Sequence, residues 1–311
     1  MSDHDDDRTA SLMTPARLAQ LKVRPKAAAS PTAYLDQMAA DAGSGHVRRL
    51  VDLRRQVESQ VVDAGGASVG SAAQALLDAL AKLDFSQVQA KGWLARATGK
   101  GKEAAAGFVA RYERILKAGE DLADEARGLQ KKQQAQGSAI DRTLVELDVE
   151  VRALEKIMDQ GARWLQDMRN QLRTREAQGG DAAVQQQIRD DTARCELLVV
   201  RLKQLRAASS ATQQAMEKCR ALAPRRAALQ GGLQQLLEGE WKAWQKRLAP
   251  VAEEAVASGS ASEGLDRARE AQQALQAAVQ QLAQDCEALQ AQEQAVGGDV
   301  AALQAPLQAA A

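Results

Sequence analysis

The stretch KGWLARATGKGKEAAAGF, which begins at residue 91, is the most enzyme-like passage of the chain. A phosphate-binding loop requires G-x-x-x-x-G-K-[ST] between a strand and a helix, so that backbone N–H groups converge on the phosphate and the hydroxyl reaches magnesium. Here six residues separate Gly92 from Gly99, and Gly101 follows Lys100 where serine or threonine is required. We therefore interpret the stretch as a break between two helices, with Glu103 in the first turn of the second, where the helix dipole favours an acid.

Histidine and cysteine provide no catalytic constellation elsewhere. His4 lies in an acidic tail and His46 at the end of a loop, so neither has the nearby partners that a metal site or a Ser/His/Asp triad needs. Cys195, Cys219 and Cys286 each fall on the apolar seam of a predicted helix, where core packing is preferred to redox or metalloid chemistry. We predict that the protein is not an enzyme and has no catalytic residue, cofactor or metal.

The segment EWKAWQKRL is the candidate contact surface. Trp241 and Trp244 lie three residues apart on one helix face, with Lys242, Lys246 and Arg247 beside them. This combination suits a membrane-surface anchor or a protein partner. Aromatic residues at helical spacing more often pack in a core, and we prefer that interpretation for the tryptophans. The five residues together remain the predicted partner or membrane contact.

The composition suits thin helix seams better than one thick globular core. The chain has 41 basic and 41 acidic residues, six prolines and only 3 % aromatic residues. This balance offers no general attraction for nucleic acid, which we do not expect as a partner. No proline occurs between Thr32 and Ala223, and such a long proline-free span favours helix because proline destabilises helix interiors.

Neither an export signal nor a membrane span is evident. The opening MSDHDDDRTASLM lacks a cationic region followed by an apolar stretch, and no run approaches the roughly 18 apolar residues that span a bilayer. Three dispersed cysteines leave at least one free thiol, which fits a reducing compartment. We expect a cytoplasmic protein, with any association with the inner membrane being peripheral.

Apolar residues that alternate at spacings of four and three predict long coiled-coil helices. The first helix would cover residues 102–177, roughly 110 Å at 1.5 Å per residue. Its seam meets a stutter where core positions fall on Gln133 and Gln136. The seam residues on either side include Phe108, Tyr112, Ile115, Gly119, Leu122, Leu147, Leu154, Gly161, Leu165 and Met168.

Turn signals separate this helix from two others. AQGGDA, with Asp181 as an N-cap, precedes a second helix that should be kinked near Pro224 and its following glycine pair. This helix should continue with Leu237, Trp241, Trp244 and Leu248 on its seam and end at Pro250. After ASGSASEG a third helix carries a seam from Leu265 to Val296. Three long helices joined by short turns must alternate in direction.

The charges of the last two helices are complementary. Residues 194–247 contain eleven basic and four acidic side chains, whereas 248–311 contain two basic and nine acidic ones. We expect the third helix to fold back on the second, because such patterning sets helix choice and orientation. A basic face for nucleic acid or anionic lipid would need unpaired Lys and Arg, and self-pairing is preferred. Asp191, a lone acid on the seam, should fix register.

The predicted fold is an all-α, elongated antiparallel bundle of three long coiled-coil-like helices with a short helical N-terminal cap. Residues 1–45 would form a disordered tail, 46–100 the cap, 101–298 the bundle and 299–311 a C-terminal tail. The cap would contain three short helices, at residues 47–63, 69–82 and 84–97.

Residues 76–130 carry a pattern in which a Leu-Asp pair precedes a short helix, a Gly-Lys break follows, and a long helix opens with two aromatic residues. The residues concerned are Leu83, Asp84, Gly99, Lys100, Phe108 and Tyr112. This pattern resembles the N-terminal part of the toxic anion resistance proteins, the TelA-like family linked with tellurite resistance. Trp241 and Trp244 resemble the aromatic-lysine region near a later helix of that family. The chain departs from the family in its Gly-Lys-Gly joint, its Gln-rich tail and its shorter length.

The resemblance implies an α-helical cytoplasmic protein that acts in stress or toxic-anion tolerance, at a membrane surface or with TerD-type stress proteins. It implies no catalytic residue. An alternative is a coiled-coil scaffold or tether of an envelope or secretion system, which would work through helix pairing alone. Protein partners are expected in either case, and self-association into a homo-oligomer is compatible with both.

Overall fold

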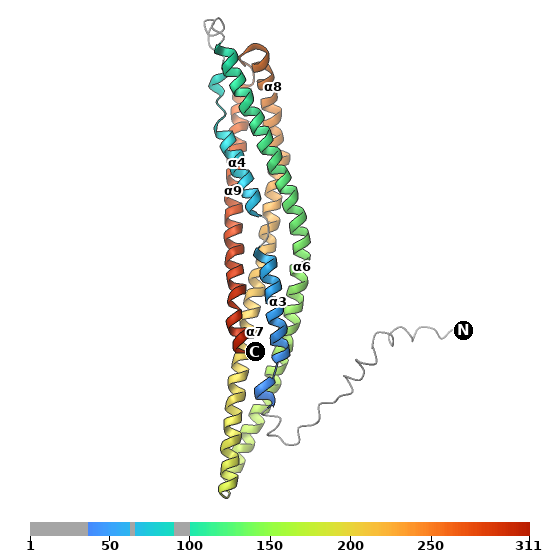
Figure 1. Ribbon diagram of the computed structural model, residues 1–311, viewed down its shortest axis with the longest axis vertical. Coiled ribbons are helices and arrows are strands. Elements are labelled where there is room, and N and C mark those ends of the chain that lie inside the picture. Colours follow the sequence, from blue (N-terminus) through green and yellow to red (C-terminus); the bar gives the residue numbers. More distant parts are fainter. Residues whose placement is uncertain (1–36, 63–65, 90–99) are drawn as a thin grey trace, which may run out of the picture. The chain divides into compact units, whose positions relative to one another are not determined.

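The computed structural model describes residues 37–62, 66–89 and 100–311 (Figure 1). Of these residues 93 % are helical and none belongs to a strand, which confirms the all-α helical bundle. The described helices are α3 (Ser44–Val62), α4 (Gly66–Ala81), the 3-10 turn η2 (Phe85–Gln87), α6 (Lys100–Gln178), α7 (Ala182–Gln235), the π-helical turn η3 (Leu236–Trp241), α8 (Lys242–Ser258), α9 (Leu265–Ala302) and α10 (Gln304–Ala309).

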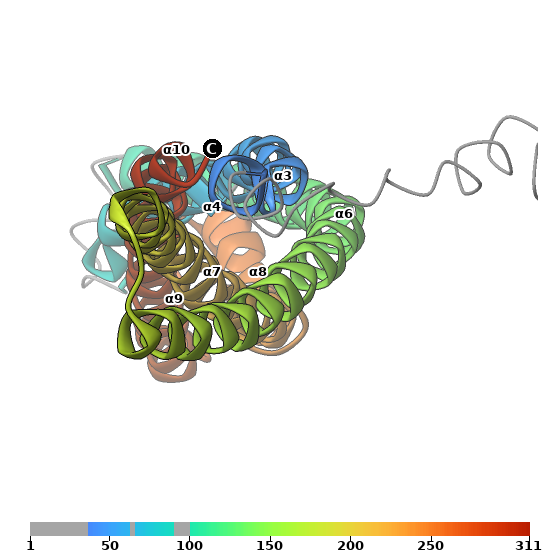
Figure 2. The ribbon, with the colours of Figure 1, turned by 90° about the horizontal axis from the view of Figure 1, so that it is seen from below.

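The first predicted long helix is present as α6, 79 residues long, with Glu103 in its first turn. The chain then reverses at the short turn that joins α6 to α7 (Figure 2). Gly179 adopts the left-handed conformation there, with φ of +70°, which glycine reaches without a steric penalty. The Asp181 carboxylate accepts a hydrogen bond from the Val184 backbone N–H at 2.9 Å, so the predicted N-cap is confirmed.

Two prolines lie inside helices, and the predicted helix end at Pro250 is wrong. Pro224 lies within α7 and Pro250 within α8, which continues to Ser258. Each proline leaves the carbonyl four residues earlier without its helical donor. Both prolines, and the residues that carry these carbonyls, Arg220 and Lys246, face solvent, so water can replace the missing donor.

Between α7 and α8 the helix is interrupted by the π-helical turn η3, which follows Pro224 and the glycine pair of α7. A π turn inserts an extra residue into the helical repeat. The core position predicted for Leu237 therefore falls on Leu236, while Leu237 lies only partly buried at its edge. After the turn Trp241, Trp244 and Leu248 return to the core.

The described chain forms two compact units, each built from segments distant in sequence. Unit 1 contains the described residues 37–47, 152–209 and 309–311. Unit 2 contains residues 48–151 and 210–308. In unit 2, α4 packs along α9, and α8 packs on α9 as well (Figure 1).

Both predicted tails contribute ordered, packed residues. In unit 1, residues 37–41 are helical, and Met38 and Ala39 pack against the apolar core between α6 and α7. The buried Arg201 side chain donates to the Ala42 carbonyl from Nε at 3.1 Å and from Nη2 at 2.9 Å. The prediction that the whole of residues 1–45 forms a disordered tail is therefore wrong for 37–45, because a distant arginine and core stabilise them; residues 1–36 lie outside the described chain.

The prediction that residues 299–311 form a C-terminal tail is also wrong. Helix α9 continues to Ala302 and α10 follows it directly. Leu303 and Leu307 are buried, so the segment is stabilised by apolar contacts that local composition did not reveal.

The short N-terminal helices agree in part with the prediction. Helices α3 and α4 occupy the first two expected positions, and Leu76, Leu80 and Leu83 are buried. The third expected helix, at 84–97, is only the turn η2 over its described residues, and 90–99 lie outside the described chain. The Asp84 carboxylate caps this turn by accepting from the Ser86 N–H at 2.9 Å.

The complementary charges of the last helices pair as predicted. Lys218 on α7 contacts Asp299 on α9 at 2.7 Å. Arg226 contacts Glu293 at 2.8 Å, and both side chains are more than nine-tenths buried. At the predicted stutter, the amide of Gln230 donates to Gln133 Oε1 at 2.6 Å, so one polar core position receives a partner from the facing helix.

Candidate functional site

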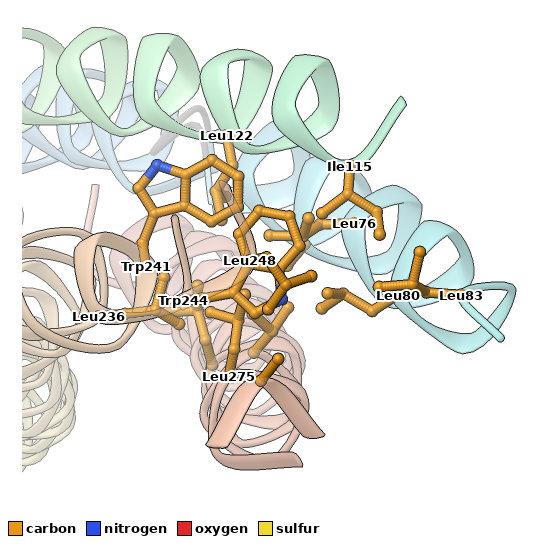
Figure 3. Packing of buried hydrophobic residues seen from close by; sticks show 14 of the residues in the cluster. Leu76, Leu80, Leu83, Ile115, Leu122, Leu236, Trp241, Trp244, Leu248 and Leu275 are labelled. Atoms are coloured by element: carbon orange, nitrogen blue, oxygen red, sulfur yellow. The ribbon is translucent and has the colours of Figure 1, made fainter. Parts of the chain in front are cut away.

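The two tryptophans of the predicted contact segment lie in the core of unit 2. Trp244 is fully buried and Trp241 is 7 % exposed. Their rings stack with centroids 5.1 Å apart, and Tyr112 stacks on Trp244 at 5.5 Å. Figure 3 shows the indoles among apolar side chains such as Leu122 and Leu248. The core interpretation is confirmed, and neither indole is available as a surface anchor.

A buried glutamine ties this aromatic cluster to two other helices. The Trp244 indole Nε1–H donates to Gln272 Oε1 of α9 at 2.6 Å. The Gln272 amide in turn donates to the Leu80 carbonyl, at the end of α4, at 2.7 Å. The indole is therefore fixed by a directed hydrogen bond as well as by packing.

The basic members of the predicted segment face solvent. Lys242, Lys246 and Arg247 are exposed, and none makes an ion pair with any residue of the described chain. The described helices include none that is both long and apolar enough to cross a bilayer. Only the cationic half of the predicted contact surface is therefore presented outward.

Three of the residues that carry the TelA-like resemblance, Leu83, Phe108 and Tyr112, belong to the core of unit 2 or pack against it. Leu83 and Phe108 are buried, and the Phe85 and Phe108 rings lie 5.7 Å apart. Tyr112 joins the tryptophan cluster described above. These three are packing positions, whereas Asp84 is exposed. Of its Gly-Lys break, Gly99 lies outside the described residues and Lys100 begins α6.

Other candidates from the sequence form no reactive cluster. His46 lies in the first turn of α3, whereas His4 and Gly92 lie outside the described chain. Within the ranges that the structure describes, no group of three His, Cys, Asp or Glu side chains is placed to hold a metal. Asp191, 3 % exposed, accepts from Arg175 at 3.2 Å and from Arg194 at 3.1 Å, which suits the register role predicted for it.

The three cysteines are free and buried, as their seam positions predict. Burial raises the pKa of Cys219 and of Cys286 to about 11, and it raises the pKa of Cys195 as well. Because the thiolate is the reactive form, these thiols are poor nucleophiles at neutral pH.

We expect all three cysteines to react slowly with a thiol reagent in the native protein at pH 8, and rapidly after denaturation. An added cysteine at an exposed position, Ser210→Cys, is the control and should react quickly. Rapid labelling of the three original cysteines in the native protein, together with a loss of tellurite tolerance when they are changed to Ser, would instead indicate metalloid chemistry.

The free energy of unfolding should also depend on pH. For Cys219 and Cys286 the folded pKa lies above the ordinary 9.0, so their contribution to stability is lost as pH rises from 9.0 to about 11.

The structure assembles a basic groove in unit 1 that the sequence reasoning missed. A groove of about 570 Å³ lies between α6 and α7. We call it the basic groove; its charged lining residues are Arg169 and Arg173 of α6, Lys203 and Arg206 of α7, and Asp159. Its apolar lining comes from Met158, Ala162, Leu165, Val199 and Leu202, and its amides from Gln166 and Asn170.

The four cations of the basic groove are exposed and make no ion pair within the described residues. Arg169 and Arg173 lie one helical turn apart, as do Lys203 and Arg206, so the cations form two facing pairs. Lys203 and Arg206 belong to the basic segment 194–247, whose charges we expected the C-terminal helix to neutralise. That pairing occurs in unit 2, whereas Lys203 and Arg206 belong to unit 1. The sequence did contain a signal for this groove: two cations one helical turn apart lie beside the seam of α6, and two more lie beside the seam of α7.

No protein-family model matches the chain, and no curated protein or solved structure is significantly similar to it.

Proposed function

We propose that this chain is a non-enzymatic helical interaction protein that acts in stress tolerance through contacts with protein partners or with a membrane surface. The interaction part of this proposal rests on the basic groove, where four cationic side chains have no carboxylate partner among residues 37–62, 66–89 and 100–311. Most surface cations gain little from fixed ion pairs, but several unpaired cations around one groove form a complementary surface for an anionic partner.

The stress-tolerance part rests on the resemblance to toxic anion resistance proteins. Leu83, Phe108 and Tyr112, which carry that resemblance, pack in or against the core of unit 2, so we expect any activity to depend on exposed residues. TerD-type stress proteins and the inner-membrane surface are the partners that the resemblance implies, in the cytoplasm. Lys242, Lys246 and Arg247 offer a second exposed cationic surface for such a contact.

A coiled-coil scaffold or tether of an envelope or secretion system is the second candidate. Large apolar side chains on the long helices face solvent: Val145 and Val149 of α6 are 62 % and 58 % exposed, and Leu197 and Val200 of α7 are 62 % and 53 % exposed. Each pair lies within one helical turn and would be covered by another helix. This arrangement favours helix pairing as the working contact.

The two candidates are separated by replacing the gene in its source organism. We expect deletion to lower tolerance of tellurite or a related stress, and a variant with Arg169, Arg173, Lys203 and Arg206 changed to Gln to reproduce the loss at normal protein level. The variant Lys242→Gln/Lys246→Gln/Arg247→Gln tests the second cationic surface in the same assay. Unchanged tolerance in the deletion strain, with a defect in envelope integrity or secretion, would support the scaffold and contradict the stress role.

A further inference from the structure

We propose that the basic groove of unit 1 binds the acidic segment at the beginning of this same chain, residues 3–7. This segment, DHDDD, contains Asp3, Asp5, Asp6 and Asp7. The inference is independent of the stress function, because it concerns which anionic group occupies the groove when no other partner is present.

The chemistry of the groove suits an acidic peptide. Arg169 and Arg173 present guanidinium forks that bind carboxylates in bidentate geometry, and Lys203 and Arg206 face them from α7. Asp159 is the only acid among the lining residues, so the groove retains a net positive charge. The apolar lining residues, Leu165 and Leu202 among them, would accept aliphatic side chains next to the carboxylates.

The start of the chain carries both features in order. Four aspartates occur within residues 3–7, and Leu12 and Met13 follow within a few residues. An extended or turning peptide of this kind would place its carboxylates on the cations and its apolar side chains on the apolar lining. Charge and apolar character therefore match the groove in the same short segment.

The chain enters unit 1 next to the groove. Met38 and Ala39 pack against the apolar core of unit 1, which includes Leu165 of the groove lining, and Leu202 of that lining packs against the same core. Arg201 holds this entry point through the Ala42 carbonyl. The segment from residue 7 to residue 37 can reach up to roughly 100 Å when extended, so its length does not prevent contact. Tethering gives the acidic segment an effective concentration on the order of mM.

Two other anionic occupants fit less well. Single-stranded nucleic acid is usually bound by aromatic platforms on which bases stack, and no aromatic side chain lines the groove. A lipid surface attracts clusters of basic residues flanked by apolar anchors. Here the apolar side chains lie between the cations of two helices, where a narrow peptide reaches them more easily than a flat membrane does.

If this proposal holds, the acidic segment competes with any other acidic partner for the basic groove. While the acidic segment occupies the groove, an acidic partner must displace it, so removing the aspartates should raise the apparent affinity for any other acidic peptide. Because the contacts are between exposed charges, we expect the competition to weaken as salt rises above physiological strength, where the Debye length falls below about 8 Å.

The test is a fluorescence titration with a labelled peptide of residues 1–13, MSDHDDDRTASLM, at low salt. Full-length protein with Asp3, Asp5, Asp6 and Asp7 changed to Asn has a vacant groove and should bind the peptide about tenfold more tightly than wild type does, because the tethered competitor is lost. Adding Arg169→Gln, Arg173→Gln, Lys203→Gln and Arg206→Gln should abolish binding. A peptide with Asn at the four aspartate positions should bind neither protein.

The matched control removes three arginines and one lysine that are exposed elsewhere: Arg114→Gln, Lys117→Gln, Arg142→Gln and Arg267→Gln in the Asn background, where affinity should be unchanged. Circular dichroism and the unfolding midpoint verify that each variant folds. Equal affinity of wild type and Asn variant, or undiminished binding after the groove cations are removed, would overturn the proposal. Vesicles of phosphatidylglycerol that bind wild type through the groove as tightly as they bind the Asn variant would identify a lipid surface as occupant and overturn it too.

Discussion

Replacing Trp244 with alanine is expected to lower the free energy of unfolding by about 3–5 kcal/mol, the range typical of a large buried aromatic side chain. The indole is fully buried, stacks between Tyr112 and Trp241, and donates to Gln272. Truncation would therefore leave a cavity and an unsatisfied amide oxygen in the core of unit 2. Chemical denaturation monitored by circular dichroism measures the loss.

Trp244→Phe is the matched control, because it keeps a six-membered ring in the stack while removing the donor to Gln272 and only part of the buried ring volume. Its cost should be smaller than that of Trp244→Ala. The double change Trp241→Ala/Trp244→Ala should be assayed for unfolding beside vesicle binding and partner pull-down. Full stability with loss of binding would show that the tryptophans form a contact surface and that their core assignment is wrong.

Removing the carboxylate of Glu293 by Glu293→Ala is expected to destabilise the protein by about 3–5 kcal/mol at neutral pH, because Arg226 would keep a buried charge without its partner. The pair is joined by the hydrogen bond from Arg226 Nε to Glu293 Oε1 at 2.8 Å. Burial raises the pKa of Glu293, and the Arg226 hydrogen bond and charge oppose that rise without cancelling it.

The double variant Arg226→Met/Glu293→Leu provides the control. It removes both charges and fills the space with apolar groups, so we expect it to recover most of the stability lost in Glu293→Ala. Lys218→Ala, which breaks the exposed pair with Asp299, should cost less than about 1 kcal/mol. A double variant as unstable as Glu293→Ala would contradict the buried-charge explanation.

The core of the fold was predictable because it depends on local spacing. Seam positions such as Phe108, Leu154 and Cys286 recur at the helical repeat, and all are buried. The turn after α6 was equally local, since Gly179 and Asp181 terminate and begin helices by their own backbone and side-chain chemistry. The structure agrees with the sequence wherever a few consecutive residues decide the outcome.

The errors occur where solvent exposure, a local irregularity of the helix or a distant residue decides the outcome. Pro250 continues a helix because it faces solvent, and Leu236 replaces Leu237 in the core because a π turn inserts a residue. Residues 37–45 are ordered because Arg201, far along the chain, holds the Ala42 carbonyl. Local composition contains no record of such contacts.

By itself the sequence determined the long helices, their order, the turn after α6 and most of the side chains that fill their seams, because the helical repeat brings these positions to one face whatever lies opposite. Only the tertiary structure decided which cations are neutralised. Arg226 and Lys218 meet acids on α9, whereas Arg173 and Arg206 line a groove without a carboxylate partner among the described residues. An ion pair forms only when two side chains from separate helices come within a few ångströms, and that distance is a property of packing that the order of residues along one helix does not contain.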